Sequence, residues 1–212
     1  MFATAALRSV GKPKFALRRL TTVLKTGDAL ELVQTENIGR KAIAKVALQP
    51  GTVINVFEEP VESRPTMHTV QFDETTHVAP TLGAEFISHA CADTNTRIVV
   101  DEDCRSASFV VTKPVEAGED LFFNYNTTEW DMNSPFACAC PACQAAGKTT
   151  NVQGFKYLTI EERTAIIKEV SPFVRSKSLQ EVNEYKALLA SLEDNTEYFA
   201  FDDESEDCEA SA

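Results

Sequence analysis

One stretch of the sequence indicates the fold most clearly: Glu116-Ala117-Gly118-Glu119-Asp120-Leu121-Phe122-Phe123-Asn124-Tyr125. Its first four residues have the composition of a turn, and the apolar and aromatic run over residues 121–125 is typical of a short strand. Short runs of this kind, separated by turn residues, account for the apolar pattern before residue 150. The sequence therefore predicts a mainly β domain built from small sheets.

The same pattern of a short apolar run beside a turn repeats towards the N-terminus. The Pro50-Gly51 pair marks one turn, and Val70 and Phe72 alternate with polar neighbours in another run. The remaining predicted strands cover residues 29–33, 40–48, 52–57, 97–100 and 108–112. No internal repeat is visible, so we expect one domain with a tail at each end.

After residue 155 the spacing of the apolar residues becomes helical. The string Thr159-Ile160-Glu161-Glu162 has the form of a capping box and opens a helix predicted to end near Pro172. A second box, Ser178-Leu179-Gln180-Glu181, is followed by apolar residues at helical spacing as far as Leu192. We therefore expect a C-terminal extension of two helices over residues 155–192, whose apolar faces pack against the protein rather than bind a ligand.

The composition is that of an ordinary globular protein. Of the 212 residues, 43% are apolar and 25% are charged. The longest apolar runs are a few residues long, whereas a membrane span needs about 20, so we expect no membrane anchor. The 13 Phe, together with Val and Ile, supply a core without the help of disulfide bonds. The oligomeric state is not encoded in any motif, and a monomer is the working expectation.

The net charge of −12 is unevenly distributed along the chain. Residues 1–27 carry six basic and no acidic side chains, and residues 193–212 carry nine acidic and no basic ones. The part between them carries 14 basic and 23 acidic side chains and has no basic stripe that could neutralise phosphates. Direct nucleic-acid binding is therefore not expected, whereas a cationic partner such as a lysine-rich protein fits this charge.

The basic segment over residues 1–27 has the composition of an organelle transit peptide. It is rich in Arg, and Phe15, Leu17 and Leu20 can form an apolar helix face. This composition predicts delivery to the mitochondrion or another organelle. The alternative is a disordered basic tail on a nuclear or cytoplasmic protein. The acidic segment over residues 193–212 is interpreted as a solvated, disordered tail.

A close array of cysteines, Cys138-Ala139-Cys140-Pro141-Ala142-Cys143, carries the most specific local chemistry. Three thiolates within six residues suit a tetrahedral Zn²⁺ site, which needs a fourth ligand from elsewhere. The cysteines that remain are Cys91, Cys104 and Cys208. A redox pair or a set of free thiols is the alternative interpretation. Cysteines that are reduced and bound to zinc indicate an intracellular protein.

Of the histidines, only His89 has a reactive neighbour, in Ser88-His89-Ala90-Cys91. A nucleophilic Cys-His pair is conceivable there. However, the sequence shows no acidic partner for the histidine and no oxyanion loop, so a hydrolase is not favoured.

Four strings of sequence precede the cysteine array in a fixed order. They are Gly39-Arg40-Lys41-Ala42-Ile43-Ala44, Gln49-Pro50-Gly51-Thr52-Val53-Ile54, Phe86-Ile87-Ser88-His89-Ala90-Cys91 and the stretch over residues 116–125 quoted above. Together with the array, their order and intervals over about residues 28–145 resemble those of SET-domain protein lysine methyltransferases that carry a post-SET zinc segment.

The resemblance implies a β-clip fold of short sheets around a pseudoknot, in which the strand of Ser88 and His89 meets the strand of Tyr125. It divides the chain into a SET domain over residues 28–130 and a post-SET segment over residues 131–147, ahead of the helical extension. It also implies a ligand set for the zinc, since the family's cysteine in the third string completes the site: Cys91, Cys138, Cys140 and Cys143.

The implied reaction is methyl transfer from S-adenosylmethionine to a lysine side chain of a protein substrate. Tyr125 matches the active-site tyrosine of the family. The positions that match its cofactor-binding residues are Gly39, Arg40, Lys41, Ser88, His89 and Tyr125. The donor carries its own leaving group, so such an enzyme works by aligning the reactants and by keeping the amine dry and neutral.

Three residues depart from the family strings. Lys41 stands at the second glycine of G-x-G, while Ser88 and Ala90 replace the asparagine and the serine of N-H-S-C. These departures leave open a catalytically silent, zinc-containing SET-like module that binds a protein segment, whereas retention of Tyr125 favours the enzyme. Without the surrounding strings, Tyr125 would be interpreted as a core aromatic of a strand.

Overall fold

The computed structural model describes residues 26–35, 39–58, 64–102 and 106–195. The predicted transit segment and the predicted acidic tail lie almost entirely outside the described residues, as do Cys104 and Cys208. What the sequence predicts for them therefore stays a prediction.

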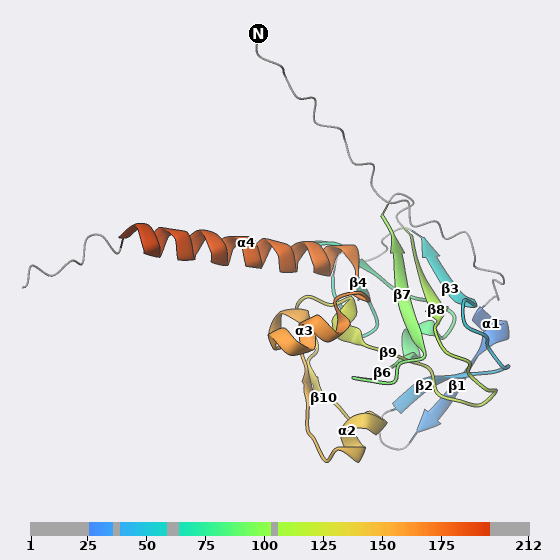
Figure 1. Ribbon diagram of the computed structural model, residues 1–212. Coiled ribbons are helices and arrows are strands. Elements are labelled where there is room, and N and C mark those ends of the chain that lie inside the picture. The colour runs from blue at the N-terminus through green and yellow to red at the C-terminus, as the bar shows by residue number, and fades with distance from the viewer. Residues whose placement is uncertain (1–25, 36–38, 59–63, 103–105, 196–212) are drawn as a thin grey trace, which may run out of the picture.

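Short strands dominate the structure, as the sequence predicts (Figure 1). In the described part of the chain, eleven strands form one three-stranded and four two-stranded sheets. In chain order they are β1 (Leu30–Thr35), β2 (Gly39–Ala44), β3 (Val53–Glu58), β4 (Val70–Gln71), β5 (His77–Val78), β6 (Ser88–His89), β7 (Thr96–Asp101), β8 (Ser106–Val111), β9 (Phe122–Phe123), β10 (Phe136–Ala137) and β11 (Asn151–Val152). The mainly β prediction is confirmed.

The helical elements are short, except for the last one. With η marking a 3-10 helix, they are α1 (Thr26–Ala29), η1 (Ala84–Phe86), η2 (Tyr125–Thr127), α2 (Pro141–Ala145), η3 (Phe155–Tyr157), α3 (Ile160–Ile166) and α4 (Pro172–Asn195). The predicted C-terminal helical extension is therefore present. No helix among the described residues combines the length and the apolar character needed to cross a membrane.

The main core is built around β8, the central strand of the three-stranded sheet β3-β8-β7. Five consecutive residues of this strand, 107–111, are buried, because elements cover both faces of the sheet. Phe109 fills the centre and meets the ring of Phe123 edge to face, with 5.3 Å between the ring centroids. This contact joins the large sheet to the strand that precedes Tyr125.

A parallel pair of two-residue strands brings two distant segments together. Strand β6 pairs with β9 so that Ser88 lies opposite Phe122 and His89 lies opposite Phe123. The side chain of Asn95 fixes the edge of this pair, because it accepts a hydrogen bond from the Phe122 N–H and donates one to the Asp120 carbonyl, each at 2.8 Å. The meeting of the Ser88-His89 strand with the segment of Tyr125 is thus confirmed.

The structure corrects the predicted end of the strand over residues 121–125. Strand β9 covers only Phe122–Phe123, and Tyr125 begins the 3-10 turn η2. The cause is Asn124, whose side-chain oxygen accepts a hydrogen bond from the Asn126 N–H at 3.1 Å and so caps the turn. Tyr125 is consequently placed on a turn that follows the strand.

The first predicted capping box forms and the second does not. Thr159 and Glu162 cap α3 reciprocally, but α4 begins at Pro172, six residues before Ser178. Proline suits the first position of a helix, and the Ser171 hydroxyl accepts a hydrogen bond from the Val174 N–H at 3.3 Å, so this earlier start is the better capped one.

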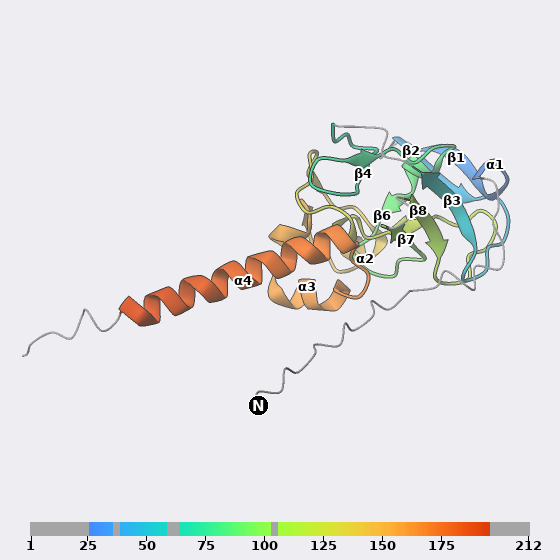
Figure 2. The same cartoon turned by 90° about the horizontal axis from the view of Figure 1, so that it is seen from above.

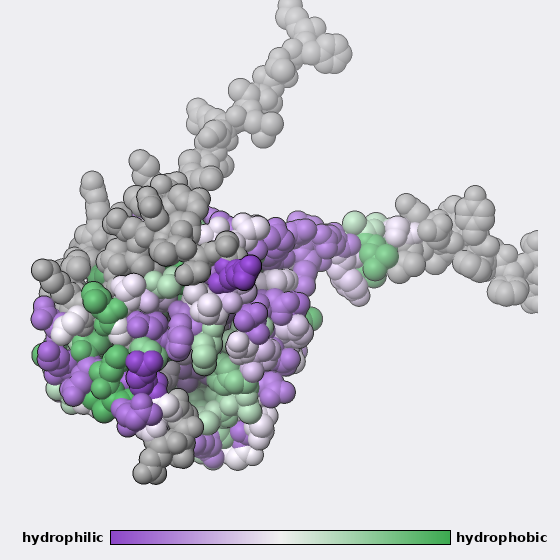
Figure 3. All heavy atoms as spheres, turned by 180° about the vertical axis from the view of Figure 1, so that it is seen from behind, coloured by the Kyte–Doolittle hydropathy of each residue, from purple (hydrophilic) through white to green (hydrophobic). Residues whose placement is uncertain are grey.

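Among its described side chains, the apolar face of the second helix is buried only in its first turn. Val174, in the first turn of α4, is fully buried, whereas the ring of Tyr185 is 62% exposed. Both ribbon views show α4 projecting away from the rest of the molecule, and the space-filling view shows apolar atoms on its outer part (Figures 1, 2 and 3). Other large apolar residues exposed on α4 are Leu179, Val182, Leu188 and Leu189.

Candidate active site and metal centre

A cavity of about 560 Å³ opens beside the β6-β9 pair. Its walls come from β2, η1, β6, β9, η2 and β10, so residues far apart in the sequence share it. Among its lining residues are Arg40, Ser88, His89, Tyr125 and Phe136. Its volume lies in the range of sites that bind a small molecule or a cofactor.

Tyr125 is held rigidly at the base of this cavity. Its hydroxyl donates a hydrogen bond to the Ile87 carbonyl at 2.7 Å, and its backbone N–H donates one to Nδ1 of His89 at 3.1 Å. The ring is surrounded by other rings, with Phe123 at 4.6 Å and Phe136 at 6.0 Å between centroids. Burial raises the pKa of the Tyr125 hydroxyl, so the group is neutral at physiological pH.

The uncharged ring of His89 lies between Tyr125 and the cysteines. Burial lowers its pKa to about 4, so the ring carries no charge at neutral pH. Its Nδ1 accepts the Tyr125 N–H, which leaves the ring proton on Nε2, 3.3 Å from Sγ of Cys91. A ring nitrogen that donates to sulfur is not free to take a proton from it. The arrangement therefore does not support a nucleophilic Cys-His pair.

Four cysteines form a second centre directly behind His89. The sulfur atoms of Cys91, Cys138, Cys140 and Cys143 all lie within 4.8 Å of one another, and Sγ of Cys91 is 3.6 Å from those of Cys138 and Cys143. Two sulfurs bound at about 2.3 Å to one tetrahedral ion would be roughly 3.8 Å apart, whereas a disulfide needs about 2.05 Å. The spacing therefore fits a metal ion and not a disulfide.

The electrostatic environment of the cysteine cluster is uneven. Burial raises the pKa of the Cys91 thiol. Burial acts in the same direction on Cys140, but the backbone N–H groups of Cys91 and Cys143 outweigh it and lower the pKa of Cys140 to about 7. One ligand is thus half ionised near neutral pH, and a cation would draw the protons from the others.

The predicted cofactor residues divide into two groups. Arg40, Ser88 and His89 line the cavity, and the Arg40 guanidinium lies 4.4 Å from the centre of the Phe86 ring. Lys41 points to the other face of β2, where Nζ is 2.6 Å from an oxygen of Asp120. Gly39 is in the left-handed region with φ +77 and contributes backbone only. The alternation of side chains along a strand separates Arg40 from Lys41.

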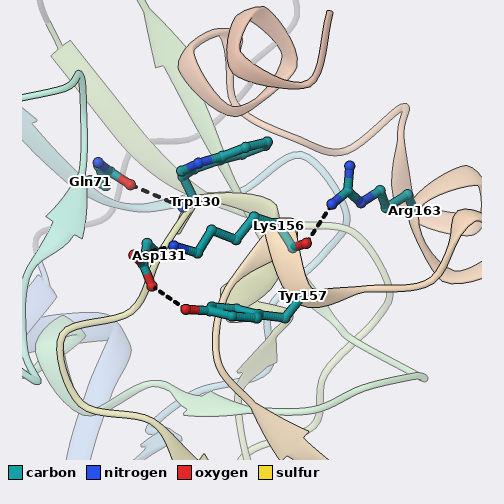
Figure 4. A network of polar contacts seen from close by, with 6 residues as sticks. All are labelled: Gln71, Trp130, Asp131, Lys156, Tyr157 and Arg163. Atoms are coloured by element: carbon teal, nitrogen blue, oxygen red, sulfur yellow. Dashed lines mark hydrogen bonds and ion pairs between the residues drawn. The ribbon is translucent and has the colours of Figure 1, made fainter. Parts of the chain in front are cut away.

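A junction of aromatic and polar contacts connects this site to the C-terminal helices (Figure 4). Trp130 stacks on Phe155 with 6.0 Å between the ring centroids. The backbone N–H of Trp130 donates a hydrogen bond to the side-chain oxygen of Gln71 at 2.9 Å. Asp131 pairs with Lys156 and accepts a hydrogen bond from Tyr157, as the close-up shows. Trp130 therefore packs against the core of the C-terminal helices.

Sequence analysis missed Glu129, a second polar residue of the cavity wall. Its side chain is only 8% exposed, and one carboxylate oxygen accepts the Gln71 N–H at 2.8 Å. Burial raises the pKa of Glu129 to about 7, and the Gln71 hydrogen bond only partly opposes this. The only available signal was an acidic residue between Thr128 and Trp130, four residues after Tyr125.

Residues 24–126 match the family model described as SET domain. Two solved structures are similar to this chain. One is ATXR5 in complex with mono-methylated histone H3.1, with 17% identity, a TM-score of 0.40, and coverage of 49% of this chain and 60% of that one. The other is the ATXR5 SET domain in complex with di-methylated histone H3, with 18% identity, a TM-score of 0.38, and coverage of 46% and 57%. This chain thus spans about three fifths of the structures it matches. The comparison with curated proteins found no match.

Proposed function

We propose that this protein, whose residues 24–126 are a SET domain, transfers a methyl group from S-adenosylmethionine to a lysine side chain of a protein substrate. The observation that carries the proposal is the β6-β9 pair, which sets His89 and Tyr125 side by side on one wall of a cavity. The two neighbours in the structure comparison are bound to histones, so histone H3 is the first substrate to test.

The residues of the cavity fit such a cofactor. Arg40, Ser88 and His89 would hold it, with the backbone at Gly39, because they combine a cation, a hydroxyl and hydrogen-bonding backbone on one wall. Lys41 takes no part in this assignment, since it does not line the cavity and its Nζ pairs with Asp120. When bound, S-adenosylmethionine supplies a methyl group on a sulfonium that is its own leaving group.

The residues of this chain then have three tasks. The neutral hydroxyl of Tyr125 donates its proton to the Ile87 carbonyl, so its oxygen lone pairs face the remaining space and orient the reacting groups. The rings of Phe123, Tyr125 and Phe136 exclude water from the wall they share. A dry wall favours the neutral form of the substrate amine, which is the reactive one.

Zinc bound by Cys91, Cys138, Cys140 and Cys143 would be structural in this proposal. With four thiolates, the ion has no open position for a substrate. Strand β10, which carries Phe136, directly precedes Cys138, and the Phe136 ring lies 5.8 Å from that of His89. The ion would therefore hold the post-SET segment, and Phe136 with it, against the cavity.

The proposal is tested by Tyr125→Phe, with Tyr185→Phe on the exposed face of α4 as the matched control. The assay measures methyl incorporation from labelled S-adenosylmethionine into histone H3 and into a mixture of lysine-containing nonapeptides. Loss of the hydroxyl should lower the rate by about 10²-fold, because small misplacements at a reacting centre cost that much. Cofactor affinity, measured by calorimetric titration, should change far less.

The outcomes separate three alternatives. Equal incorporation by wild type and Tyr125→Phe would remove Tyr125 from the mechanism. Binding of S-adenosylmethionine by wild type, with no incorporation into any lysine, would favour the catalytically silent module. Absence of cofactor binding would overturn the proposal as a whole.

We also propose that residues 1–27 direct the protein to the mitochondrion or another organelle. The support is the composition of the segment, which is basic and free of acidic residues. A fluorescent reporter fused after residue 27 should enter an organelle, whereas a reporter with Arg8, Arg18 and Arg19 changed to Gln should not. A diffuse signal from the unchanged segment would contradict the proposal.

A further inference from the structure

We propose that Glu129 is a second catalytic residue, whose carboxylate accepts the proton that the substrate ammonium must lose before methyl transfer. This inference rests on the proposed function, because it concerns a step of that reaction. Glu129 belongs to none of the strings that resemble the SET family, and it is deduced from its position in the cavity wall.

The backbone brings Glu129 to the same side of the chain as Tyr125. The Glu129 N–H donates to the Tyr125 carbonyl at 3.0 Å, which closes one helical turn. Side chains four residues apart on such a turn lie on one face. Both residues line the same cavity, as this geometry requires.

One oxygen of the carboxylate is anchored and the other is not. The Gln71 N–H holds Oε1 at 2.8 Å, and the Gln71 side chain in turn accepts the Trp130 N–H at 2.9 Å, so β4 fixes the position of Glu129. Within the described ranges, no hydrogen bond reaches Oε2 and no ion pair involves Glu129. A buried carboxylate without a cation is unfavourable, so the wall is prepared for a cationic group that enters the cavity.

A lysine ammonium satisfies this requirement and the chemistry of the step. One N–H bond of the ammonium breaks and one O–H bond forms on Oε2 of Glu129, and the nitrogen keeps the electron pair. The products are a neutral amine, whose lone pair is now available, and a neutral carboxylic acid. The acid releases its proton to solvent through the cavity mouth before the next cycle, so charge and atoms balance.

The other groups around the cavity do not duplicate this role. Both ring nitrogens of His89 are engaged, Nδ1 by the Tyr125 N–H and Nε2 by Sγ of Cys91. Burial lowers the pKa of His77 opposite Gln71 and raises that of Tyr125. The remaining charged or titratable residues of the cavity wall are Arg40, His68, Glu85 and Asp120, together with Cys138 and Cys140 of the metal centre. Asp120 is paired with Lys41, and Glu85 accepts the Gly83 N–H at 2.9 Å. His68 is tested with a variant of its own.

The test measures kcat and KM of Glu129→Gln against pH, with histone H3 and lysine nonapeptides as methyl acceptors. Glutamine keeps the shape and still accepts the Gln71 N–H, but it cannot take a proton. At pH 7 kcat should fall by about 10²-fold with little change in KM, as for loss of a general base. The deficit should shrink towards pH 10, because a free lysine amine loses its proton near pH 10.4 without help.

Two further variants sharpen the result. Glu129→Asp keeps a carboxylate, so its kcat should still rise as pH passes through neutrality, although from a lower level. His68→Asn should leave that rise in place. If the rise of kcat with pH were lost in His68→Asn and kept in Glu129→Gln, His68 would be the proton acceptor. This result would overturn the inference.

The failure of this inference differs from that of the proposed function. An active wild type and a Glu129→Gln variant with the same kcat from pH 6 to pH 10 would overturn the role of Glu129 alone. A wild type that methylates no lysine would overturn both. Retention of the unfolding transition and of bound zinc by Glu129→Gln shows that a lower rate is not a loss of fold.

Discussion

Two regions attach the C-terminal part of the chain to the part that matches the SET domain model, and they do so by different physics. The cysteine cluster (Cys91, Cys138, Cys140 and Cys143) gathers four sulfurs in one small buried group with Ala90 and Val152. The aromatic junction (Trp130, Phe155, Val170 and Val174, with Arg163 over the two rings) is a dry packing contact in which Phe155 is fully buried. The cysteine cluster needs a bound metal ion, whereas the aromatic junction is stabilised by the packing of its side chains alone.

The difference teaches that the two attachments should respond to pH in opposite directions. Metal binding needs deprotonated thiols, so the cluster gains stability as pH rises. Next to the junction, the buried carboxyl of Glu129 must ionise as pH rises, and burial opposes that. The single tryptophan of the chain, Trp130, lies in the junction and so reports on one region only.

The largest expected effect is removal of the ion from the cysteine cluster. We expect about one zinc per chain by metal analysis, absent in Cys91→Ser and present in Cys104→Ser. Structural zinc sites contribute on the order of 10 kcal/mol, so chelation should loosen residues 131–153. Trp130 fluorescence should change little, since the junction packs independently. Zinc that survives Cys91→Ser but is lost with Cys104→Ser would assign the wrong fourth ligand.

The second effect is the pH dependence contributed by Glu129. Its pKa is about 7 in the folded protein and about 4.5 unfolded, so the unfolded state releases the proton first. Stability is therefore full below about pH 4.5 and falls as pH rises to 7, by about 3 kcal/mol at most. Glu129→Gln should remove this loss, and urea denaturation should find it more stable than wild type at pH 8 but not at pH 4.5. The exposed Glu169→Gln serves as the control.

A smaller effect is expected where the chain crosses itself at Gly154. A Cβ there would lie 2.6 Å from the Trp130 carbonyl oxygen, and the backbone has φ +115, which suits glycine alone. Gly154→Ala should cost about 2 kcal/mol in the free energy of unfolding and shift Trp130 fluorescence. Gly147→Ala, with φ +60 and open space around it, should cost about 1 kcal/mol and leave the fluorescence unchanged. Equal costs would show that the close approach is not tight.

The smallest expected effect on the free energy of unfolding concerns Arg163, which lies over the two rings of the junction and binds to residues around it. Its guanidinium donates to the carbonyls of Lys156 and Leu158 and to Glu181 on α4. Arg163→Lys keeps the charge but loses the planar set of donors, so it should cost about 1 kcal/mol in thermal or urea unfolding. Glu181→Gln, which loses one half-exposed ion pair, should cost less than about 0.5 kcal/mol. A larger cost for Glu181→Gln than for Arg163→Lys would mean that charge, and not the geometry of the guanidinium donors, stabilises the contacts of Arg163.

The fold could be predicted from the sequence where several strings occur together in a fixed order and at fixed intervals. The SET strings predicted that Ser88 and His89 meet the segment of Tyr125, and the structure pairs β6 with β9. They also implied Cys91 as the fourth ligand, and among the described residues Cys91 lies in the cluster with the three cysteines of the array. Such long-range contacts were accessible because each depends on residues of a distinctive type at fixed intervals.

Other features of the structure could not be predicted from the sequence, because two local signals competed or because the feature depends on distant residues. Ser178 and Glu181 form a good capping box on paper, but Ser171 and Pro172 cap the same helix earlier, and a helix starts at its first adequate cap. Glu129 was not predicted because its environment depends on a contact with Gln71 of β4, 58 residues away, which the alternation of Val70 and Phe72 does not encode. Whether the apolar side chains of α4 find a packing partner depends on where the helix points, which no local pattern encodes.

The separation of Cys91 from the other three ligands sets an order in time during protein synthesis. Cys138 follows Cys91 by 47 positions, which at about 5–20 residues per second is roughly 2–10 s of translation. A nascent chain that has not yet exposed residues 138–143 holds only one of the four ligands, Cys91, and cannot complete the tetrahedral site. Phe136 emerges with the later cysteines. Metal loading and completion of the cavity wall are therefore one late event in the synthesis of the chain.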